Sequence, residues 1–312
     1  MSDFKFRKRV LFIGIPDMAY VCLDGLKAAG VNIVGAFGAK KDHNTYESFK
    51  YFANSRNVNF IEYDNLKDEE FIAKIKELKP DVAVVCSFNY KIPKVLLDAV
   101  PGGFINIHPS LLPKYRGGNP YSPVIMNDEK VTGVTIHFME ENFDTGDIIS
   151  QKQTLVTPKE TMGTLFNRLN LLGLEMLLQA LRDFEKGNLP RQKQPKGEFP
   201  VGNLLSDAEL FIDFNKSASE IERFIRALNP FFNASTMFRN TFVKIFSADA
   251  TDFDAVSQSP VGTIEKIKDD KFFIKTSSGL ISPKVLQFGS FFVSDSKDFI
   301  KILNLKEGEK FG

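Results

Sequence analysis

The stretch "RVLFIGIPDMAYVCLDGLKAAGVNIVGAFG", residues 9–38, alternates two short apolar runs with a segment of helical spacing. The runs cover residues 9–15 and 31–38, and the segment between them ends at Gly30. Strands that read as continuous apolar runs are typical of a parallel sheet whose two faces are both covered. A strand, a helix and a second strand in this order therefore predict an α/β fold that begins at Arg9.

The same alternation continues along the chain. It predicts strands at residues 58–63, 81–88, 103–108, 131–139 and 147–156, and helices at residues 46–56, 68–79 and 161–186. This pattern indicates a doubly wound, mostly parallel, Rossmann-like sheet. In such sheets ligands bind beyond the carboxyl ends of the strands, which is where the segment 103–120, "GFINIHPSLLPKYRGGNP", breaks into a loop.

The pattern changes after residue 190. Residues 187–203 are rich in Pro, Gly and basic side chains, which is typical of a linker. Beyond them, one helix at residues 218–229 is followed by short alternating strands separated by turn residues. We therefore predict an N-terminal domain at 1–190, a linker at 191–203 and a smaller β-barrel-like, OB-like domain at 204–312.

Composition excludes several classes of protein. Forty basic and 39 acidic side chains give a net charge of +1, so no global field attracts the chain to nucleic acid or an anionic membrane. The two cysteines, Cys22 and Cys86, lie inside apolar runs, which favours reduced thiols in a cytoplasmic protein. The sequence shows no signal peptide and no stretch long and apolar enough to span a membrane.

Three familiar kinds of site are disfavoured. A dinucleotide fingerprint needs a run of glycines after the first strand, and only Gly14 fits, with Pro16 and Asp17 in the turn. No metal site is expected, because the three histidines are scattered without ligand spacing. Ser110 lacks the G-x-S-x-G setting of a hydrolase nucleophile, so we interpret it as a turn or capping residue.

Asn106, His108 and Asp144 are the strongest candidates for chemistry. Residues two apart in a strand point to the same face, so Asn106 and His108 project together. An amide and an imidazole stabilise a developing oxyanion, and a carboxylate orients the imidazole and assists proton transfer. By itself, a histidine at a strand end is structural about as often as it is catalytic.

Two motifs carry a resemblance to a known family. Residues 106–120, "NIHPSLLPKYRGGNP", and residues 132–149, "TGVTIHFMEENFDTGDII", resemble the 10-formyltetrahydrofolate-dependent formyltransferases. That family includes enzymes acting on glycinamide ribonucleotide, on methionyl-tRNA and on nucleotide-linked amino sugars. The start of the chain and its C-terminal segments also resemble the last two branches, whereas the glycinamide ribonucleotide enzyme lacks a C-terminal domain.

The resemblance implies a role for each matching residue. Asn106 and protonated His108 would stabilise the tetrahedral oxyanion, while Asp144 would orient His108 and assist proton transfer. The cosubstrate would be 10-formyltetrahydrofolate, with no metal. Its pocket would be formed, largely through backbone groups, by Cys86, Ser87, Phe88, Asn89, Tyr90, Ile92, Ser110, Leu111, Leu112 and Pro113. The acceptor would contact Gly14, Pro16, Asp17, Lys114, Tyr115 and Arg116.

The amine that accepts the formyl group is predicted from loop length. The methionyl-tRNA enzymes carry a long basic insertion after the second strand, whereas here only Lys40, Lys41 and His43 lie in that loop. We therefore favour a small amine, most plausibly a nucleotide-linked 4-amino sugar, over methionyl-tRNA. The basic residues of 190–196 and the helix at 222–228 keep tRNA as the alternative. Formyltetrahydrofolate hydrolysis and non-catalytic folate or nucleotide binding rank lower, and the oligomeric state and the role of the C-terminal domain stay open.

Overall fold

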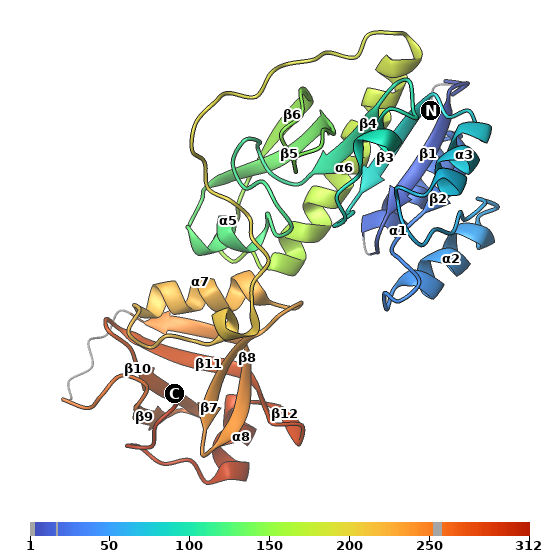
Figure 1. The fold of residues 1–312 in the computed structure, drawn as a ribbon. Helices are drawn as coiled ribbons and strands as arrows, with labels where there is room; N and C mark the ends of the chain where they lie inside the picture. The colour runs from blue at the N-terminus through green and yellow to red at the C-terminus, as the bar shows by residue number, and fades with distance from the viewer. Residues whose placement is uncertain (1–3, 17, 252–257) are drawn as a thin grey trace. The chain divides into compact units, whose positions relative to one another are not determined.

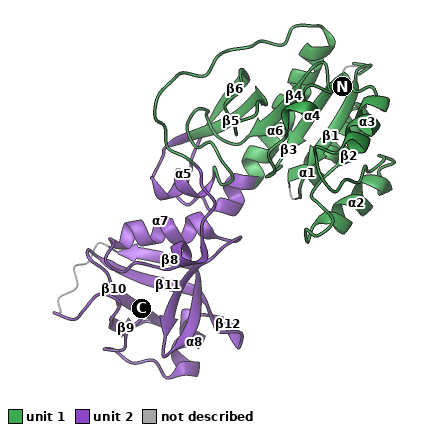
Figure 2. Cartoon of the chain, viewed as in Figure 1, with its two compact units in different colours: residues 1–120, 132–154, 167–201 green, residues 121–131, 155–166, 202–312 purple. Residues whose placement is uncertain are grey.

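The structure is a computed structural model that describes residues 4–16, 18–251 and 258–312 (Figure 1). The chain divides into two compact units (Figure 2). Unit 1 comprises residues 1–120, 132–154 and 167–201, and unit 2 comprises residues 121–131, 155–166 and 202–312. Among the described residues, no helix is long and apolar enough to cross a membrane.

Unit 1 is built on a mixed sheet in the strand order β2-β1-β3-β4-β5-β6. The first four strands pair in parallel, and β5 runs antiparallel to β4. This arrangement confirms the predicted Rossmann-like, mostly parallel sheet. The strands are β1 (Arg9–Gly14), β2 (Asn32–Phe37), β3 (Val82–Cys86), β4 (Phe104–His108), β5 (Val131–Phe138) and β6 (Ile148–Leu155).

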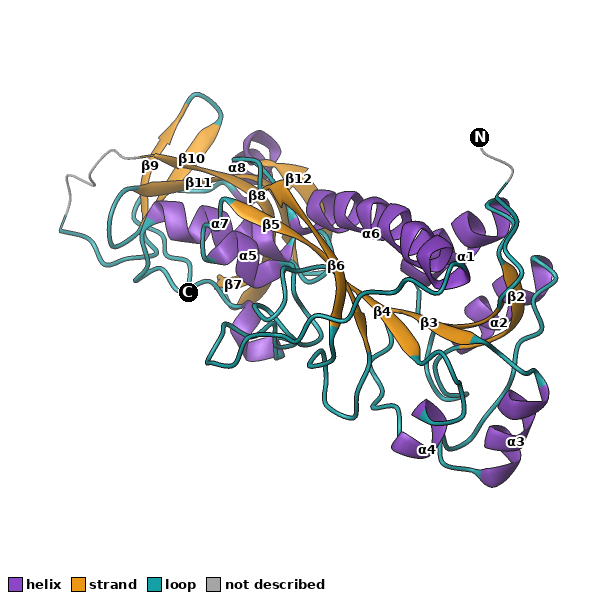
Figure 3. Ribbon diagram, turned by 90° about the horizontal axis from the view of Figure 1, so that it is seen from above, coloured by secondary structure: helices purple, strands orange, loops and turns teal. Residues whose placement is uncertain are grey.

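Helices cover both faces of this sheet. Figure 3 shows α1 and α6 on one side of the strands β1 to β4, and α3 and α4 on the other. Gly25 of α1 lies so close to Leu174 of α6 that a Cβ on the glycine would come within 2.3 Å of that side chain. The helices that begin in the first 201 residues are α1 (Met18–Ala28), α2 (Tyr46–Ser55), α3 (Glu69–Glu77), α4 (Lys94–Leu97), α5 (Ser122–Met126) and α6 (Met162–Glu185).

One predicted strand is wrong. Residues 58–63 form only an isolated bridge between Phe60 and Ala36 of β2. Two hydrogen bonds hold it, from the Ala36 N–H to the Asn59 carbonyl (2.9 Å) and from the Ile61 N–H to the Ala36 carbonyl (2.7 Å). The pairing stops there, and the hydroxyl of Tyr63 donates to a loop carbonyl beyond β2. Apolar spacing marked this segment as buried, which it is, but burial alone does not make a strand.

Unit 2 contains an antiparallel sheet in the order β7-β8-β11-β10-β9, with β12 paired to β11. The end of the chain joins the two edges of this sheet, because Phe311 bridges Phe238 in β7 and Lys310 bridges Thr263 beside β9. This closure gives the barrel-like form predicted from the sequence. The elements are η1 (Asp207–Leu210), α7 (Ala218–Leu228), β7 (Ala234–Phe238), β8 (Thr241–Thr251), β9 (Ile264–Lys268), β10 (Lys271–Lys275), β11 (Leu280–Phe288), β12 (Phe292–Asp295) and α8 (Ser296–Leu303).

Local sequence explains how α7 and the barrel form. A capping box between Ser217 and Glu220 begins α7, where each side chain satisfies the other residue's backbone N–H. Inside the barrel, the rings of Phe238 and Phe311 stack with centroids 4.4 Å apart, and Phe272 stacks on Phe311 at 5.9 Å. All three side chains are fully buried, so they form the centre of a core separate from that of unit 1.

Candidate active site

The structure brings Asn106, His108 and Asp144 together at the carboxyl end of β4. The Nδ1 atom of His108 lies 3.5 Å from Oδ2 of Asp144. The amide nitrogen of Asn106 lies 3.1 Å from Nε2 of His137. The same Nε2 atom of His137 lies 3.5 Å from Oδ1 of Asp144. The predicted proximity of the three residues is therefore present in the structure, and a second histidine joins them.

The backbone places Asp144 under strain. Its φ is +56°, a conformation that residues other than glycine rarely adopt. The Gly117 N–H donates to its Oδ2 at 2.9 Å. Two residues later, a Cβ on Gly146 would come within 1.9 Å of the Phe138 carbonyl oxygen, so only glycine fits. The D-T-G motif thus has a physical basis, because its glycine lets the loop turn back and deliver the carboxylate to His108.

The partners of His108 decide where its proton lies. Its Nε2 is 2.8 Å from the carbonyl oxygen of Tyr115, which can only accept, so Nε2 carries the hydrogen. The other ring nitrogen, Nδ1, faces Asp144. Burial lowers the pKa of His108 below its ordinary value, although the charge of Asp144 opposes this. This shift favours the neutral imidazole, in which Nδ1 presents a lone pair to the carboxylate.

Asp144 stays ionised in this setting. Burial by itself raises the pKa of Asp144, but His108, His137 and the Gly117 N–H together lower it below its ordinary value. His108 has the largest lowering effect on this pKa, so the ionisation of Asp144 and the protonation of His108 are coupled. A carboxylate beside a neutral imidazole can stabilise the imidazolium that forms when His108 takes a proton.

His137 is a site residue that sequence reasoning missed. Its side chain is 1% exposed, and its Nδ1 lies 2.8 Å from the Phe138 carbonyl, so Nδ1 donates and Nε2 is left to accept from Asn106. In the antiparallel pair of β4 and β5, His137 stands directly opposite Asn106, and opposite residues share a face. The register between β4 and β5 would have revealed the contact of His137 with Asn106, but this register cannot be read from a single sequence.

Comparison with known proteins identifies the family. Residues 17–181 match the model of the formyl transferase family, and residues 204–304 match the model of the formyl transferase C-terminal domain. The chain belongs to the formyl transferase family. It is accordingly an enzyme of that family, as the resemblance implied.

Curated relatives match this formyl transferase along almost its whole length. The methionyl-tRNA formyltransferase of Clostridioides difficile is 34% identical over 286 residues, covering 89% of this chain and 92% of the relative. That of Halothermothrix orenii is 30% identical over 315 residues, covering 97% and 99%. Both alignments include the barrel of unit 2, so the relatives share the two-part organisation.

Solved structures share the fold at lower identity. The N-formyltransferase from Helicobacter canadensis, in complex with folinic acid and dTDP-3-aminofucose, has a TM-score of 0.67 and 19% identity, covering 88% of this chain and 98% of that one. HypX from Aquifex aeolicus, in complex with tetrahydrofolic acid, has a TM-score of 0.66 and 17% identity. It covers 97% of this formyl transferase, which spans about half of HypX (48%).

The first segment predicted to form the folate pocket follows β3. Cys86 is fully buried, and Ser87 has a φ of +56° with its carbonyl accepting from the Ile15 N–H at 2.8 Å. The rings of Phe88 and Tyr90 lie 5.2 Å apart. Ile92 is a core residue, whereas Asn89 is exposed. The side chains of Cys86 and Ile92 thus pack in the core. Within this segment, only residues 87–91 have side chains accessible to a ligand.

The second predicted segment, Ser110 to Pro113, is held by hydrogen bonds to neighbouring parts of the protein. The Ser110 hydroxyl donates to the Lys114 carbonyl at 2.7 Å, which agrees with its interpretation as a turn residue. The Leu112 N–H donates to Thr135 Oγ1, and the Leu112 carbonyl accepts from Gln151. Leu112 and Pro113 are buried, and Leu111 is half-buried. Because Leu112 already has backbone partners in the protein, this segment contributes mainly shape to a pocket.

The residues predicted for the acceptor have different surroundings. A Cβ on Gly14 would come within 2.6 Å of Ala19 and 2.7 Å of the Cys86 carbonyl, so Gly14 permits close packing of β1, β3 and α1. Pro16 is half-buried, and Asp17 lies outside the described residues. Lys114 is exposed, whereas the Tyr115 side chain is buried, and Arg116 donates to Gln194 at 2.5 Å. The Tyr115 carbonyl contacts His108 directly.

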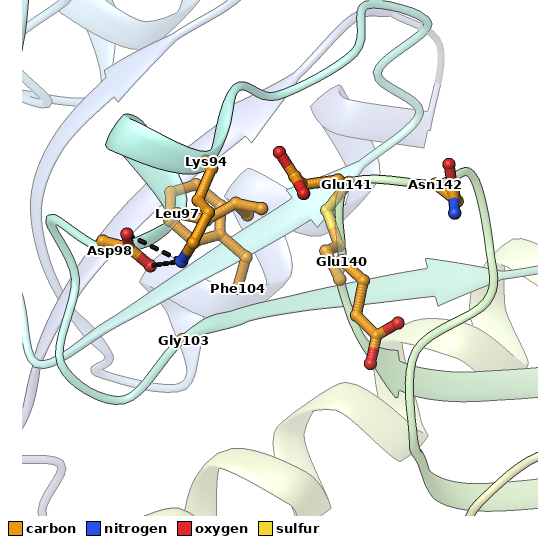
Figure 4. A pocket seen from close by; sticks show the side chains of 9 residues that line it. Lys94, Leu97, Asp98, Gly103, Phe104, Glu140, Glu141 and Asn142 are labelled. Carbon is orange, nitrogen blue, oxygen red and sulfur yellow. Dashed lines mark hydrogen bonds and ion pairs between the residues drawn. The ribbon is translucent and has the colours of Figure 1, made fainter.

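A cavity of about 420 Å³ lies away from this chemistry. It opens near the first residues of β4, at the strand end opposite His108, and Figure 4 shows the ion pair of Lys94 with Asp98 (2.7 Å) on its wall. Its lining residues are Lys94, Leu97, Asp98, Gly103, Phe104, Met139, Glu140, Glu141 and Asn142. None of the predicted site residues is among them, so we place the candidate active site at His108 and not in this cavity.

Proposed function

We propose that this formyl transferase moves the formyl group of 10-formyltetrahydrofolate to the amino group of methionyl-tRNA. The observation that carries the chemistry is the buried contact of His108 with Asp144, beside the amide of Asn106. The acceptor rests on the curated relatives, which are named methionyl-tRNA formyltransferases and match both units at 30–34% identity.

The donor is supported by the ligands of the structural neighbours. The structure of HypX holds tetrahydrofolic acid, and that of the Helicobacter canadensis enzyme holds folinic acid, which is 5-formyltetrahydrofolate. We propose that the folate lies at the carboxyl ends of β3 and β4, against residues 86–92 and 110–113, as such sheets place their ligands. In that position the formyl carbon would be near Asn106 and His108.

The proposed reaction gives each of the three side chains a role. The acceptor amine attacks the formyl carbon, and the carbonyl electrons move to oxygen. The Asn106 amide has two N–H groups. One donates a hydrogen bond to Nε2 of His137, and the other donates to this oxyanion. His108 takes a proton from the new ammonium at Nδ1 while Asp144 stabilises the imidazolium. His108 then passes that proton to N10 of the folate as the oxyanion reforms the carbonyl and the bond from carbon to N10 breaks, with the bonding electrons left on N10.

The neutral state of His108 changes one expectation. The family resemblance assigns oxyanion stabilisation to a protonated His108, whereas its pKa is lowered by burial. We therefore propose that His108 begins the reaction as a proton acceptor and becomes a charged donor only after the attack. The negative charge of Asp144 then stabilises His108 most after the attack, while the imidazole is protonated.

Loop length predicted a sugar amine ahead of methionyl-tRNA, whereas the curated relatives favour the reverse order. One structural observation still supports a small acceptor as the second candidate. Only residues 38–45 separate β2 from α2, and Lys41 in this loop already pairs with Glu62 (3.4 Å) and Asp64 (3.7 Å). A loop so short, with one of its lysines engaged, offers little charge to the phosphates of an RNA.

The acceptor is tested by direct competition. Purified protein with 10-formyltetrahydrofolate is offered initiator methionyl-tRNA in one reaction and dTDP- or UDP-linked amino sugars in another, and products are measured by mass spectrometry. We expect kcat/KM for methionyl-tRNA to exceed that for any sugar by about 10²-fold or more. Faster formylation of a sugar would reverse the ranking. Release of formate without either product would instead indicate a hydrolase.

A further inference from the structure

Residues 191–201, here called the strap, are bonded to both loops that carry the candidate active site. Their composition predicts a linker, yet they belong to unit 1. Near one end, Gln192 and Ile148 exchange two backbone hydrogen bonds of 2.8 and 2.9 Å. Near the other end, the Tyr115 N–H donates to the Pro200 carbonyl at 2.5 Å. The strap therefore connects the start of β6 with the loop after β4.

Gln194 lies between these two attachments and joins the loops through its side chain. Its amide nitrogen donates to the carbonyl oxygens of Asp144 and Gly146, each at 2.8 Å. Its amide oxygen accepts from the guanidinium of Arg116 at 2.5 Å. One side chain thus fixes the backbone of the Asp144 loop and the direction of Arg116.

Each loop that Gln194 joins contains a residue with a strained backbone. Tyr115 and Asp144 both have positive φ values, +59° and +56°. Such conformations persist only where surrounding contacts enforce them. His108 contacts the Tyr115 carbonyl and the Asp144 carboxylate, while the strap contacts the Tyr115 N–H and the Asp144 carbonyl. The strap and His108 therefore hold opposite sides of the same two residues.

Charged neighbours reinforce this placement. Asp147 pairs with Lys193 at 3.2 Å, and Arg191 stacks its guanidinium 3.6 Å from the centre of the Phe138 ring. The lysine is largely exposed, so the ion pair contributes little by itself. Gln194, in contrast, is half-buried and contacts the Asp144 carbonyl directly.

We propose that Gln194 is a positioning residue for formyl transfer, which holds the Asp144 loop and Arg116 so that the Asp144 carboxylate reaches His108. The effect on rate rests on the proposed function. The effect on the geometry of His108 does not, because it can be measured without substrate. An incidental contact of a solvated linker would leave both properties unchanged on substitution.

Gln194→Met tests the proposal, because methionine has a similar length but neither donates nor accepts these hydrogen bonds. Gln192→Met is the matched control, since the side chain of Gln192 is exposed on the same strap. Losing two hydrogen bonds to the loop corresponds to about a 10-fold or larger fall in kcat. We expect the folate dissociation constant to stay near the wild-type value and the control to keep wild-type activity.

The second readout is the titration of His108, followed by NMR of the imidazole nitrogens. The chain has three histidines, so the spectrum is simple. The charged or titratable groups that face His108 are Asp144, which raises its pKa, and His137 and Arg116, which lower it. If Asp144 moves away in the Gln194→Met protein, the titration of His108 shifts to lower pH. The Gln192→Met protein should titrate like the wild type.

Wild-type kcat together with an unshifted His108 titration in Gln194→Met would overturn the proposal, as would equal losses in the control. If Gln194→Met does not fold, Gln194→Asn keeps the amide but shortens the side chain by one methylene, and the same shift is expected. If the wild-type protein formylates neither acceptor, the proposed function fails. The His108 titration then still decides whether Gln194 positions Asp144.

Discussion

Replacing His108 with alanine is expected to lower the rate of formyl transfer by about 10³-fold, because the reaction loses its proton acceptor. The side chain is 5% exposed and Nδ1 faces Asp144, so bulk water cannot easily take its place. Folate binding should persist, since the predicted folate segments, residues 86–92 and 110–113, do not include this imidazole. Single-turnover rates and a folate titration of the same protein measure the two properties separately.

A matched variant separates proton transfer from packing. His108→Gln retains an N–H donor for the Tyr115 carbonyl and fills more of the space, but its amide does not titrate near neutral pH. Similar losses in the alanine and glutamine proteins would assign the effect to the proton. Wild-type activity in either protein would contradict the mechanism. Thermal unfolding of both variants checks that the buried site still folds.

Replacing Asp144 with asparagine is expected to lower the rate by about 10²-fold and to shift its pH dependence. The charge of Asp144 favours the protonated form of His108 and so raises the pKa of that imidazole. Removing the charge lowers this pKa further, and the limb of the pH profile that reports His108 therefore moves to lower pH. Asparagine has nearly the same shape and can still accept from the Gly117 N–H.

The same substitution has a pH-dependent effect on stability. The folded pKa of Asp144 is below its ordinary value, so its ionisation contributes stability above that ordinary value and loses it as the pH falls. Urea unfolding at neutral and acidic pH should therefore show that the difference in unfolding free energy between wild type and Asp144→Asn shrinks in acid.

The kinetic measurement decides the coupling of Asp144 to His108. If the pH profile of kcat/KM is the same in wild type and in Asp144→Asn, the two residues are not coupled.

Local patterns predicted the fold because they report local properties. Continuous apolar runs indicated the buried parallel strands β1 to β4, and alternating strands after residue 230 indicated the antiparallel barrel. The predicted strand at residues 58–63 was wrong, because the apolar spacing there reflects burial beside β2 and only one bridge forms. Burial and strand pairing often coincide, but a pattern of apolar residues records only the first.

The candidate site was predicted in part for a related reason. Asn106 and His108 are two apart on one strand, so the sequence places them on one face without further information. Asp144 joined them as a carboxylate able to orient the imidazole, and the motif around it then supported the resemblance to a family. His137 was missed, because its contact with Asn106 depends on the register between β4 and β5. Register is a long-range property, and a single residue of slip would turn His137 to the other face.

The sequence by itself determined the kinds of element, the order of the two folds and the residues able to transfer a proton. Only the tertiary structure decided how these residues are held: the Tyr115 carbonyl on His108, the Gly117 N–H on Asp144 and the amide of Gln194 beneath the same loop. Gln194 follows Asp144 by fifty residues in a segment of linker composition. Periodicity describes neighbours along the chain, whereas such contacts form between segments that only folding brings together.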